Sequence, residues 1–478
     1  MKPTSSSSWE GTLTLDSYSR SRHQLSFCYW VDSLRFTDSY WYDNVDFYEL
    51  EERYGQAQMG RIYFHLLAFE AMKAACLKPK FFDLGQYSQY YTECFDSLWH
   101  EIFDHTYAQW RYENNLPFYK GPTIVNVNQT DSQIKEIPLE PIFGETDVLA
   151  SFGGGKDSLV LCKLLERADI SFSCYSYAGT AFGNIEKQFS LIENLLKHTN
   201  YVRFHRNYGY GDYLNTPVVR LYPEYGVKTQ PKDPFLIPPP TALFTMLPLV
   251  LQYGYRYIIV GNERSADTGN LIWQETGEEI NHQWSKTTQS DRLIADYVRA
   301  KLIKGLSYFS LLKPIYDPVI FNLLSQDSHA FSDTHSCNFG KPWCERCAKC
   351  AYVYLSAMAY LPQEKVRAVF QNNLFDLPEN QIWYRQMLGL EEHKAFECVG
   401  EIEEVRLAFE ICRQKGLTGQ AINMFINEVP PQDYQKIVKK YTQVNSKYEL
   451  PQDFIAKIFP QMEAAASSAQ ELIAEQLK

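Results

Sequence analysis

The segment that most constrains the fold of this chain lies at residues 148–161. It begins with a short apolar run at 148–151, continues through three consecutive glycines at 153–155, and becomes an apolar stretch that opens with Asp157 and Ser158. This order predicts a strand, a tight turn and the start of a helix. Glycines let the backbone approach an anion closely, and free amides at a helix start attract negative charge. We therefore predict a phosphate-binding loop.

The spacing of this loop separates two classes of phosphate site. A Walker A loop ends in Gly-Lys-Ser/Thr, so that a hydroxyl reaches magnesium, whereas here Asp157 follows Lys156 and Ala150 stands where the first glycine would be. Residues 153–158 instead resemble the Ser-Gly-Gly-x-Asp-Ser loop of the PP-loop ATP pyrophosphatases, with Gly153 in place of the first serine. That resemblance implies cleavage of ATP between its alpha and beta phosphates and adenylation of a substrate oxygen. The alternative is a glycine turn without a ligand.

The rest of this region alternates between strand-like and helix-like segments. We expect strands at 148–151, 171–177, 201–205 and 257–260, and helices at 158–167, 185–198 and 241–253. Such alternation predicts an α/β fold with a parallel sheet and helices on both faces, and the PP-loop resemblance implies the adenine nucleotide alpha hydrolase-like form of it. Ligands bind beyond the carboxyl ends of parallel strands. The loops expected to converge there are 152–158, 178–184 and 261–270.

Two other modules are expected to flank this region. An aromatic-rich α+β module should occupy 1–138, a PP-loop ATP-pyrophosphatase domain 145–361, and a helical region 362–478, with a polar linker at 131–146. Within the first module we expect two or three antiparallel strands inside 23–50, then helices at 59–77 and within 87–110. Its many aromatic side chains are interpreted as core rather than as a base-stacking surface.

Composition narrows the class of protein. The formal net charge of −11 disfavours a nucleic-acid partner, because phosphate binding requires clustered lysines and arginines. Residues 1–8 lack the apolar core of a signal peptide, and no apolar run reaches the length of a membrane span. Eleven cysteines without a signal peptide argue against a disulfide scaffold. We expect a cytoplasmic enzyme that does not enter the membrane, of undetermined oligomeric state.

A second strong motif is Cys337-x6-Cys344-x2-Cys347-x2-Cys350. Zinc takes four soft ligands in a tetrahedron, and each C-x2-C step supplies two from one turn. We expect a structural zinc ion here, with His335 as a substitute if one cysteine does not bind. A redox pair or unliganded thiols are the alternatives. The pattern resembles the zinc knuckle of the 7-cyano-7-deazaguanine synthases, which are also PP-loop enzymes.

Polar residues follow the other predicted strands. Gly179 follows the second strand, where the PP-loop resemblance implies that adenosine is held. Residues 261–267 follow the last strand and offer two carboxylates, Glu263 and Asp267, and a cation, Arg264, for a metal-bound phosphate. Each could also be an ordinary loop residue.

Two further polar features stay open on chemistry alone. The stretch 281–286 contains His282 and Lys286, and its role cannot be derived from residue types. Lys313 precedes a proline and could reach a phosphate or be a solvated surface lysine. The segment 393–404 is interpreted as a connection between two helices.

Over most of its length the chain resembles the UDP-N-acetylmuramoyl-L-alanyl-L-glutamate epimerase (MurL-type) family. The features that carry this are the aromatic first module, the loop at 153–158, and the motifs at 261–266, 343–350 and 396–400. Membership implies an isomerase of peptidoglycan precursor synthesis that inverts the terminal L-Glu of a nucleotide-linked small molecule, UDP-MurNAc-L-Ala-L-Glu. ATP would be cleaved to AMP and diphosphate through an acyl-adenylate. The alternative is an enzyme of 7-deazaguanine synthase type that adenylates a nucleobase carboxylate.

The resemblances imply roles for particular residues. The nucleotide, with Mg²⁺, would be held by residues Ser151, Gly153, Gly154, Gly155, Asp157, Ser158, Gly179, Gly261, Glu263 and Asp267. Within that set, Asp157, Glu263 and Asp267 would organise Mg²⁺. Lys156 or Arg264 would offset the remaining phosphate charge. By chemical type alone, the candidates for the proton-transfer base are Cys398, Glu397 and His282.

Overall fold

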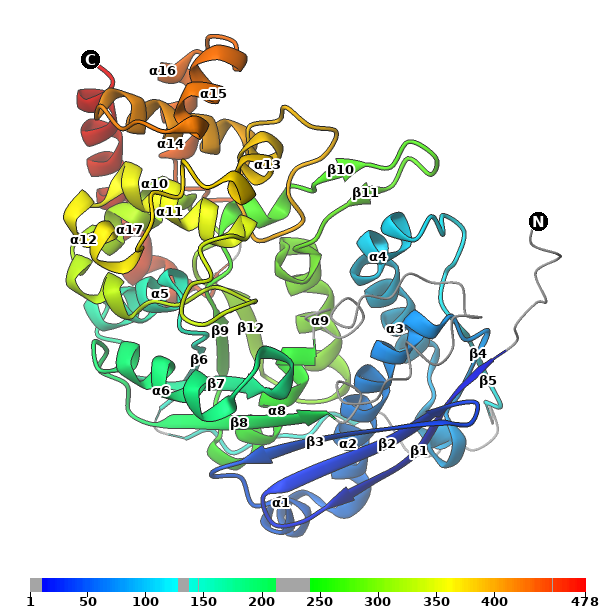
Figure 1. Ribbon diagram of the computed structural model, residues 1–478. Coiled ribbons are helices and arrows are strands. Elements are labelled where there is room, and N and C mark those ends of the chain that lie inside the picture. Colours follow the sequence, from blue (N-terminus) through cyan, green and yellow to red (C-terminus); the bar gives the residue numbers. More distant parts are fainter. Residues whose placement is uncertain (1–10, 128–136, 145, 212–240, 449) are drawn as a thin grey trace, which may run out of the picture.

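The structure, a computed structural model, describes residues 11–127, 137–144, 146–211, 241–448 and 450–478 (Figure 1). One ten-stranded sheet runs through it in the order β12-β9-β6-β7-β8-β3-β2-β1-β4-β5. Its strands are β1 Thr12–Arg20, β2 Gln24–Val31, β3 Leu34–Tyr42, β4 Phe81–Asp83, β5 Thr123–Val125, β6 Val148–Ser151, β7 Phe172–Gly179, β8 Phe204–Gly211, β9 Tyr257–Val260 and β12 Ser307–Ser310. A separate hairpin pairs β10 Leu271–Ile272 with β11 Glu279–Ile280.

The half of the sheet that contains the glycine loop is parallel. Strands β12, β9, β6, β7 and β8 run in one direction, which confirms the predicted α/β class. Strand β8 then pairs antiparallel with β3, from Asp38 opposite Gly211 to Tyr42 opposite Asn207. The strands of the predicted first module therefore continue the same sheet rather than form a sheet of their own. The division into three domains stays an interpretation of the sequence.

Helices cover both faces of the parallel half of the sheet (Figure 1). Side chains alternate along β6, where Val148 and Ala150 belong to one hydrophobic core and Leu149 to the other. The first core is built with α5 Lys156–Arg167, α6 Ile185–Leu196, α10 Asp317–Ser325 and α11 Ala348–Tyr360. The second is built with α2 Gln56–Ala71, α3 Glu93–Thr106, α8 Thr241–Tyr253 and α9 Thr288–Lys301.

The aromatic residues of the first module lie mostly in the second core. Phe27, Tyr29 and Tyr40 are buried against α2, whereas Trp41 and Tyr48 are exposed. Two short helices complete this part, α1 Phe47–Tyr54 and α4 Ala108–Glu113. This supports the interpretation of the aromatic residues as core. The predicted linker lies partly outside the described residues, which omit 131–136 and 145.

The C-terminal part is helical, as the sequence predicts. Its helices are α12 Gln363–Val369, α13 Pro378–Met387, α14 Ile402–Gln414, α15 Gln420–Glu428, α16 Tyr434–Tyr441 and α17 Gln452–Gln476. A capping box between Glu401 and Glu404 starts α14, so the segment that precedes it ends at a fixed point. Within the described ranges, no helix combines the length and apolar character needed to cross a membrane.

Candidate functional site

The glycine loop connects β6 to α5, and within it Gly153 is exposed, Gly155 is half-buried and Gly154 is buried. Gly154 has a φ of 86°, a conformation that residues with a Cβ rarely adopt. The backbone amide of Gly153 donates to Ser158 Oγ at 3.0 Å. Gly155 is the N-cap of α5, and among the described residues this helix start has no side-chain cap. A helix start without a side-chain cap is suited to binding an anion.

The segment that leads into the four cysteines forms a wall against this loop. A Cβ at Gly154 would lie 2.2 Å from the His335 ring, and one at Gly155 would lie 2.8 Å from Ser336 Oγ. The His335 amide also donates to the Gly154 carbonyl at 2.8 Å. His335 thus lies on the glycine loop, outside the group of metal-ligand side chains formed by the four cysteines. Glycine is favoured at 154 for space as well as for conformation, whereas Gly155, with a φ of −93°, is restricted by space alone.

Lys156 is inside the fold rather than at an open surface. Its side chain is 5% exposed, and its ammonium pairs with Asp157 at 2.6 Å and with Asp317. Burial alone would lower the Lys156 pKa, but the carboxylates of Asp157, Asp317 and Glu263 outweigh it and raise the pKa. The Lys156 charge is therefore already offset by carboxylates. This position does not favour the predicted role in neutralising a phosphate.

The loop after β9 approaches the glycine loop closely. A Cβ at Gly261 would lie 3.2 Å from the carbonyl oxygen of Asp157. Glu263 is buried, and although burial opposes ionisation, the cations of Lys286, Lys156 and Lys349 lower its pKa to about 2. A charged carboxylate thus lies beside the predicted nucleotide loop. The predicted convergence of these two loops is observed.

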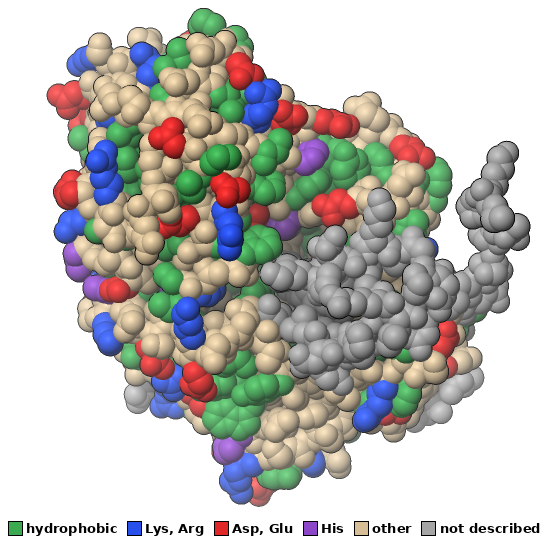
Figure 2. Space-filling view, in the orientation of Figure 1, with side chains coloured by type: hydrophobic (Ala, Val, Ile, Leu, Met, Phe, Trp, Pro, Cys, Tyr) green, Lys and Arg blue, Asp and Glu red, His purple; other side chains and the backbone are tan. Residues whose placement is uncertain are grey.

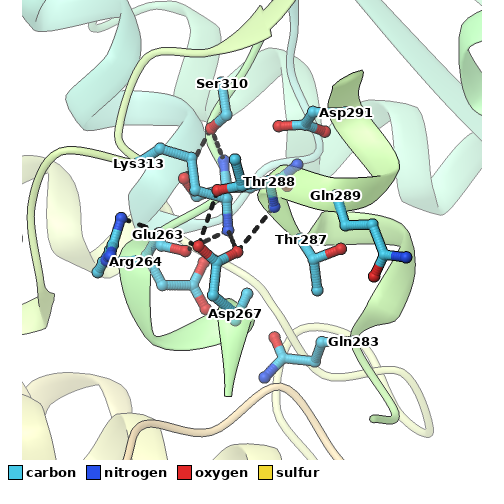
Figure 3. Close-up of polar contacts among 12 residues, drawn as sticks. Glu263, Arg264, Asp267, Gln283, Thr287, Thr288, Gln289, Asp291, Ser310 and Lys313 are labelled. Atoms are coloured by element: carbon cyan, nitrogen blue, oxygen red, sulfur yellow. Dashed lines mark hydrogen bonds and ion pairs between the residues drawn. The ribbon is translucent and has the colours of Figure 1, made fainter. Parts of the chain in front are cut away.

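Asp267, on the same loop as Glu263, is held by Lys313 and Thr288 (Figure 3). Its carboxylate accepts hydrogen bonds from Lys313 Nζ at 2.8 Å, from the Thr288 amide at 2.8 Å and from Thr288 Oγ1 at 2.7 Å. The Lys313 side chain is 0% exposed, so its interpretation as a solvated lysine is wrong. Arg264 Nη1 lies 3.9 Å from Asp267. With its oxygens occupied in this way, Asp267 is a poor candidate for a Mg²⁺ ligand.

The four cysteines, Cys337, Cys344, Cys347 and Cys350, form one cluster, called the cysteine knuckle below. All four sulfurs lie within 4.8 Å of one another. The Cys337–Cys347 sulfurs are 3.9 Å apart and the Cys344–Cys350 sulfurs 3.8 Å apart. Tetrahedral zinc with Zn–S bonds of about 2.3 Å requires S···S separations of about 3.8 Å. The knuckle can therefore hold a metal ion, as the spacing of the cysteines predicts.

The three candidate bases, His282, Glu397 and Cys398, also come together. Their ligand atoms lie within 4.8 Å of one another, and we call them the His–Glu–Cys cluster. Lys286 Nζ donates to Cys398 Sγ at 3.1 Å, and Lys349 Nζ donates to the Cys398 carbonyl at 2.8 Å. These side chains are also metal-ligand types, but an ammonium beside the sulfur disfavours a second cation there. The arrangement is instead suited to proton transfer.

The His–Glu–Cys cluster lines a cavity of about 340 Å³, the cluster cavity. Helix α4 supplies Gln109, whose side-chain oxygen hydrogen-bonds His282 Nδ1 at 2.6 Å. Phe182, from the loop after β7, lines the same cavity. The first module and the predicted loop at 178–184 therefore both contribute to this cavity.

Electrostatics connect the cluster cavity to the glycine loop. Burial would lower the Lys286 pKa, but Cys398, Glu263 and Asp157 together raise it. The His282 pKa is lowered, first by burial and then by Lys286 and Lys349, with Glu397 opposing. Lys286 thus interacts electrostatically with Asp157 of the glycine loop, with Glu263 and with the sulfur of the cluster at the same time.

Several site residues were not singled out from the sequence. Lys286 belongs to a polar stretch without a recognisable pattern, and Gln109 lies in a helix of the first module. Lys349 lies inside the cysteine motif, between Cys347 and Cys350. A positive charge between two candidate metal ligands is the one sequence signal that points to it. Asp317, which pairs with Lys156, carries no such signal.

Two segments of the chain match models of known protein families. A family model of the MurL C-terminal domain matches residues 328–438, and one of the MurL N-terminal domain matches residues 239–311. Both matched ranges are thus similar to domains of the MurL family, and together they cover less than half of the chain. The first range contains the cysteine knuckle and Cys398, and the second contains Glu263 and His282. The glycine loop at 153–158 lies outside both ranges.

Similar proteins include three that come from different bacteria. Each is named UDP-N-acetyl-alpha-D-muramoyl-L-alanyl-L-glutamate epimerase. The protein of a Micromonospora species is 38% identical over 33% of this chain and 36% of its own. The Salinispora tropica protein is 32% identical over 36% and 39%, and the Xanthomonas oryzae pv. oryzae protein is 32% identical over 37% and 42%. The chain thus spans about two fifths of the length of these relatives.

Proposed function

We propose that this protein epimerises the terminal L-Glu of UDP-MurNAc-L-Ala-L-Glu to D-Glu in peptidoglycan precursor synthesis, with cleavage of ATP to AMP and diphosphate. The observation that carries the proposal is the His–Glu–Cys cluster in a cavity beside a loop suited to phosphate. The names of the three relatives agree with it. A cytoplasmic location would follow, because nucleotide-linked precursors and ATP are found there.

The chemistry explains why one site would combine nucleotide and base. The alpha proton beside a free carboxylate is very weakly acidic, because its removal would place a second charge next to the first. Transfer of AMP to the carboxylate removes that charge and makes the carbonyl an electron acceptor. A base then removes the alpha proton, and return of a proton to the opposite face gives the D centre. Hydrolysis of the adenylate releases AMP and the product.

The described residues divide these tasks. The amides of 153–155 and Ser158 would hold the departing diphosphate. The predicted Mg²⁺ would be held by Asp157 and Glu263, whose carboxylate oxygens are ligands that Mg²⁺ prefers, and would offset phosphate charge. Cys398, whose sulfur faces the Lys286 ammonium, would transfer a proton on one face of the alpha carbon. Glu397 or His282 would serve the other face.

The cysteine knuckle would hold a structural zinc ion in this proposal. Four cysteine ligands fill a tetrahedron and leave no position for a substrate. Backbone amides of Phe339 and Gly340 donate to Cys337 Sγ at 3.4 and 3.3 Å, contacts that stabilise a charged sulfur. Through His335 the same segment would fix the glycine loop.

One assay tests the activity. The protein is incubated in D₂O with ATP, Mg²⁺ and UDP-MurNAc-L-Ala-L-Glu, and the adenine products and the configuration of the glutamate are measured. We expect AMP, diphosphate and D-Glu with deuterium on the alpha carbon. AMP without D-Glu would contradict the epimerase proposal, and ADP in place of AMP would contradict the PP-loop assignment. Cys94→Ser, which changes an exposed cysteine, is the matched control for Cys398→Ser.

A further inference from the structure

A second cavity lies beside the cysteine knuckle and has a volume of about 630 Å³. This knuckle cavity is lined by residues of the knuckle, of α13 and of the segment that precedes α14, including Arg346, Trp383 and His393. Its volume falls within the range of about 300–1,000 Å³ that is typical of ligand sites. The proposed reaction assigns it no role.

The knuckle cavity adjoins the cluster cavity. Five side chains line both of them: Gln109, Glu113, Phe339, Phe396 and Glu397. Because Glu397 belongs to the His–Glu–Cys cluster, the junction lies at the proposed site of proton transfer. A ligand whose reacting end occupies the cluster cavity can therefore extend through the junction into the knuckle cavity.

The walls of the knuckle cavity are rich in aromatic side chains. The rings of His393 and Phe396 are stacked with centroids 4.6 Å apart, and Phe339 is 54% exposed. Trp383 is half-buried and is oriented by a hydrogen bond from its Nε1 to the Arg346 carbonyl at 3.2 Å. In Figure 2, hydrophobic and histidine side chains gather on the face between α13 and the β10–β11 hairpin. Open aromatic faces of this kind bind nucleobases by stacking.

One cation lies at the far end of this cavity. Arg346 lines the knuckle cavity but not the cluster cavity. Within the part of the chain that the structure describes, its guanidinium has no hydrogen-bond or ion-pair partner. A free guanidinium binds phosphate oxygens in a bidentate geometry. The carboxylates of Glu113 and Glu397 lie at the junction, so a diphosphate would be repelled there and attracted to Arg346.

We propose that the knuckle cavity binds the nucleoside diphosphate end of the substrate, with the base on the aromatic walls and the diphosphate on Arg346. This inference rests on the proposed function, because a nucleotide-linked dipeptide is the ligand that needs both cavities. The terminal glutamate of the substrate then lies beside Cys398 in the cluster cavity. The sugar of the substrate lies near Phe396, where the two cavities meet. Arg346 and Trp383 would determine specificity for the nucleotide carrier without contacting the reacting carbon.

Direct binding of UDP tests this site independently of catalysis. Isothermal titration calorimetry is done with α,β-methylene-ATP at saturation, so that the glycine loop is occupied. Arg346→Ala should weaken UDP binding by about tenfold or more, because a charge-assisted contact is lost, and should leave uridine binding unchanged. Trp383→Ala should weaken both ligands. The control is Arg385→Ala. Arg385 lies on α13, as Trp383 does, but it pairs with Glu391 and Glu428 and does not line the cavity.

Equal UDP affinity in the Arg346→Ala and Arg385→Ala variants would overturn the inference, as would failure of the native protein to bind UDP. Metal analysis of Arg346→Ala excludes damage to the knuckle as the cause of a loss. In the epimerase assay, Arg346→Ala should raise KM for the nucleotide-linked substrate and leave KM for MurNAc-L-Ala-L-Glu unchanged. If the native protein epimerises neither substrate but binds UDP through Arg346, the proposed reaction fails and the binding site stands.

Discussion

Alanine is expected to be tolerated at Gly153 but not at the neighbouring Gly154. Gly154 has a φ of 86°, and a Cβ there would lie 2.2 Å from the His335 ring. At Gly153 the nearest atom to a Cβ would be Ser158 Oγ, at 3.9 Å, an ordinary contact. The two substitutions therefore add the same atom to the same loop and differ in backbone conformation and in available space.

The expected magnitude follows from these two terms. A left-handed backbone costs a residue with a Cβ about 1–2 kcal/mol, and forcing an atom into a filled site costs about 1–3 kcal/mol. Together they predict that Gly154→Ala lowers the free energy of unfolding by about 2–5 kcal/mol. Gly153→Ala should change it by less than about 1 kcal/mol, because removing a glycine at a compatible position also restricts the unfolded chain.

Guanidinium unfolding followed by circular dichroism measures these differences. Adding His335→Ala separates the two terms, because it removes the clash but leaves the backbone conformation. Gly154→Ala measured in that background should cost only the backbone term of about 1–2 kcal/mol. Equal stability of the Gly153→Ala and Gly154→Ala proteins would refute the reasoning. The absence of any coupling between Gly154 and His335 would refute the steric term.

Three further predictions concern the knuckle, the cluster and a buried carboxyl. Cys347→Ser should lose zinc and unfold at a lower temperature, whereas Cys94→Ser should keep both properties; unchanged zinc in metal analysis would count against the knuckle. Cys398→Ala should lower kcat by about 10²–10⁴-fold with nucleotide binding retained, and an undiminished kcat would remove this residue from the reaction. Burial raises the Asp291 pKa to about 7 from its ordinary 3.8, against the effect of Lys313. The folded chain therefore keeps a proton that the unfolded chain loses, and stability should fall between pH about 4 and about 7 by up to about 1.4 kcal/mol per pH unit. Asp291→Asn should flatten this slope in unfolding titrations, and an identical slope would contradict the assignment.

The central strands could be predicted from the sequence because each is a short apolar run with a clear end. Residues 148–151 and 257–260 were expected as strands and are β6 and β9 with the same bounds. For β8 the sequence predicts a strand at 201–205, but the strand occupies Phe204–Gly211. Its polar and glycine residues lack strand periodicity, and its pairing with β3, from a distant part of the chain, stabilises the extended conformation. Local pattern cannot show such a partner.

In the candidate site, too, local sequence motifs could be predicted, whereas contacts between distant segments could not. The glycine loop and the cysteine knuckle each lie within a few consecutive residues, so spacing alone indicates their chemistry. His282 and Cys398 were chosen by residue type, and their proximity depends on how two distant segments fold together. The contacts of Lys286 with Cys398 and of Gln109 with His282 arise in the same way. The burial of Lys156 and Lys313 also depends on distant carboxylates, Asp317 and Asp267.

The pairing of β3 with β8 has a consequence for any attempt to isolate the parallel half of the sheet. A fragment that starts at residue 146 would leave one side of β8 without its antiparallel neighbour. Unpaired strand edges recruit other chains by the same hydrogen bonds that join strands within a sheet. Tyr210 is already 47% exposed in the intact chain and would add an aromatic surface to that edge. We expect such a fragment to self-associate, which light scattering would detect. In the intact chain, β3 covers the edge of β8 and thereby protects the protein from aggregation.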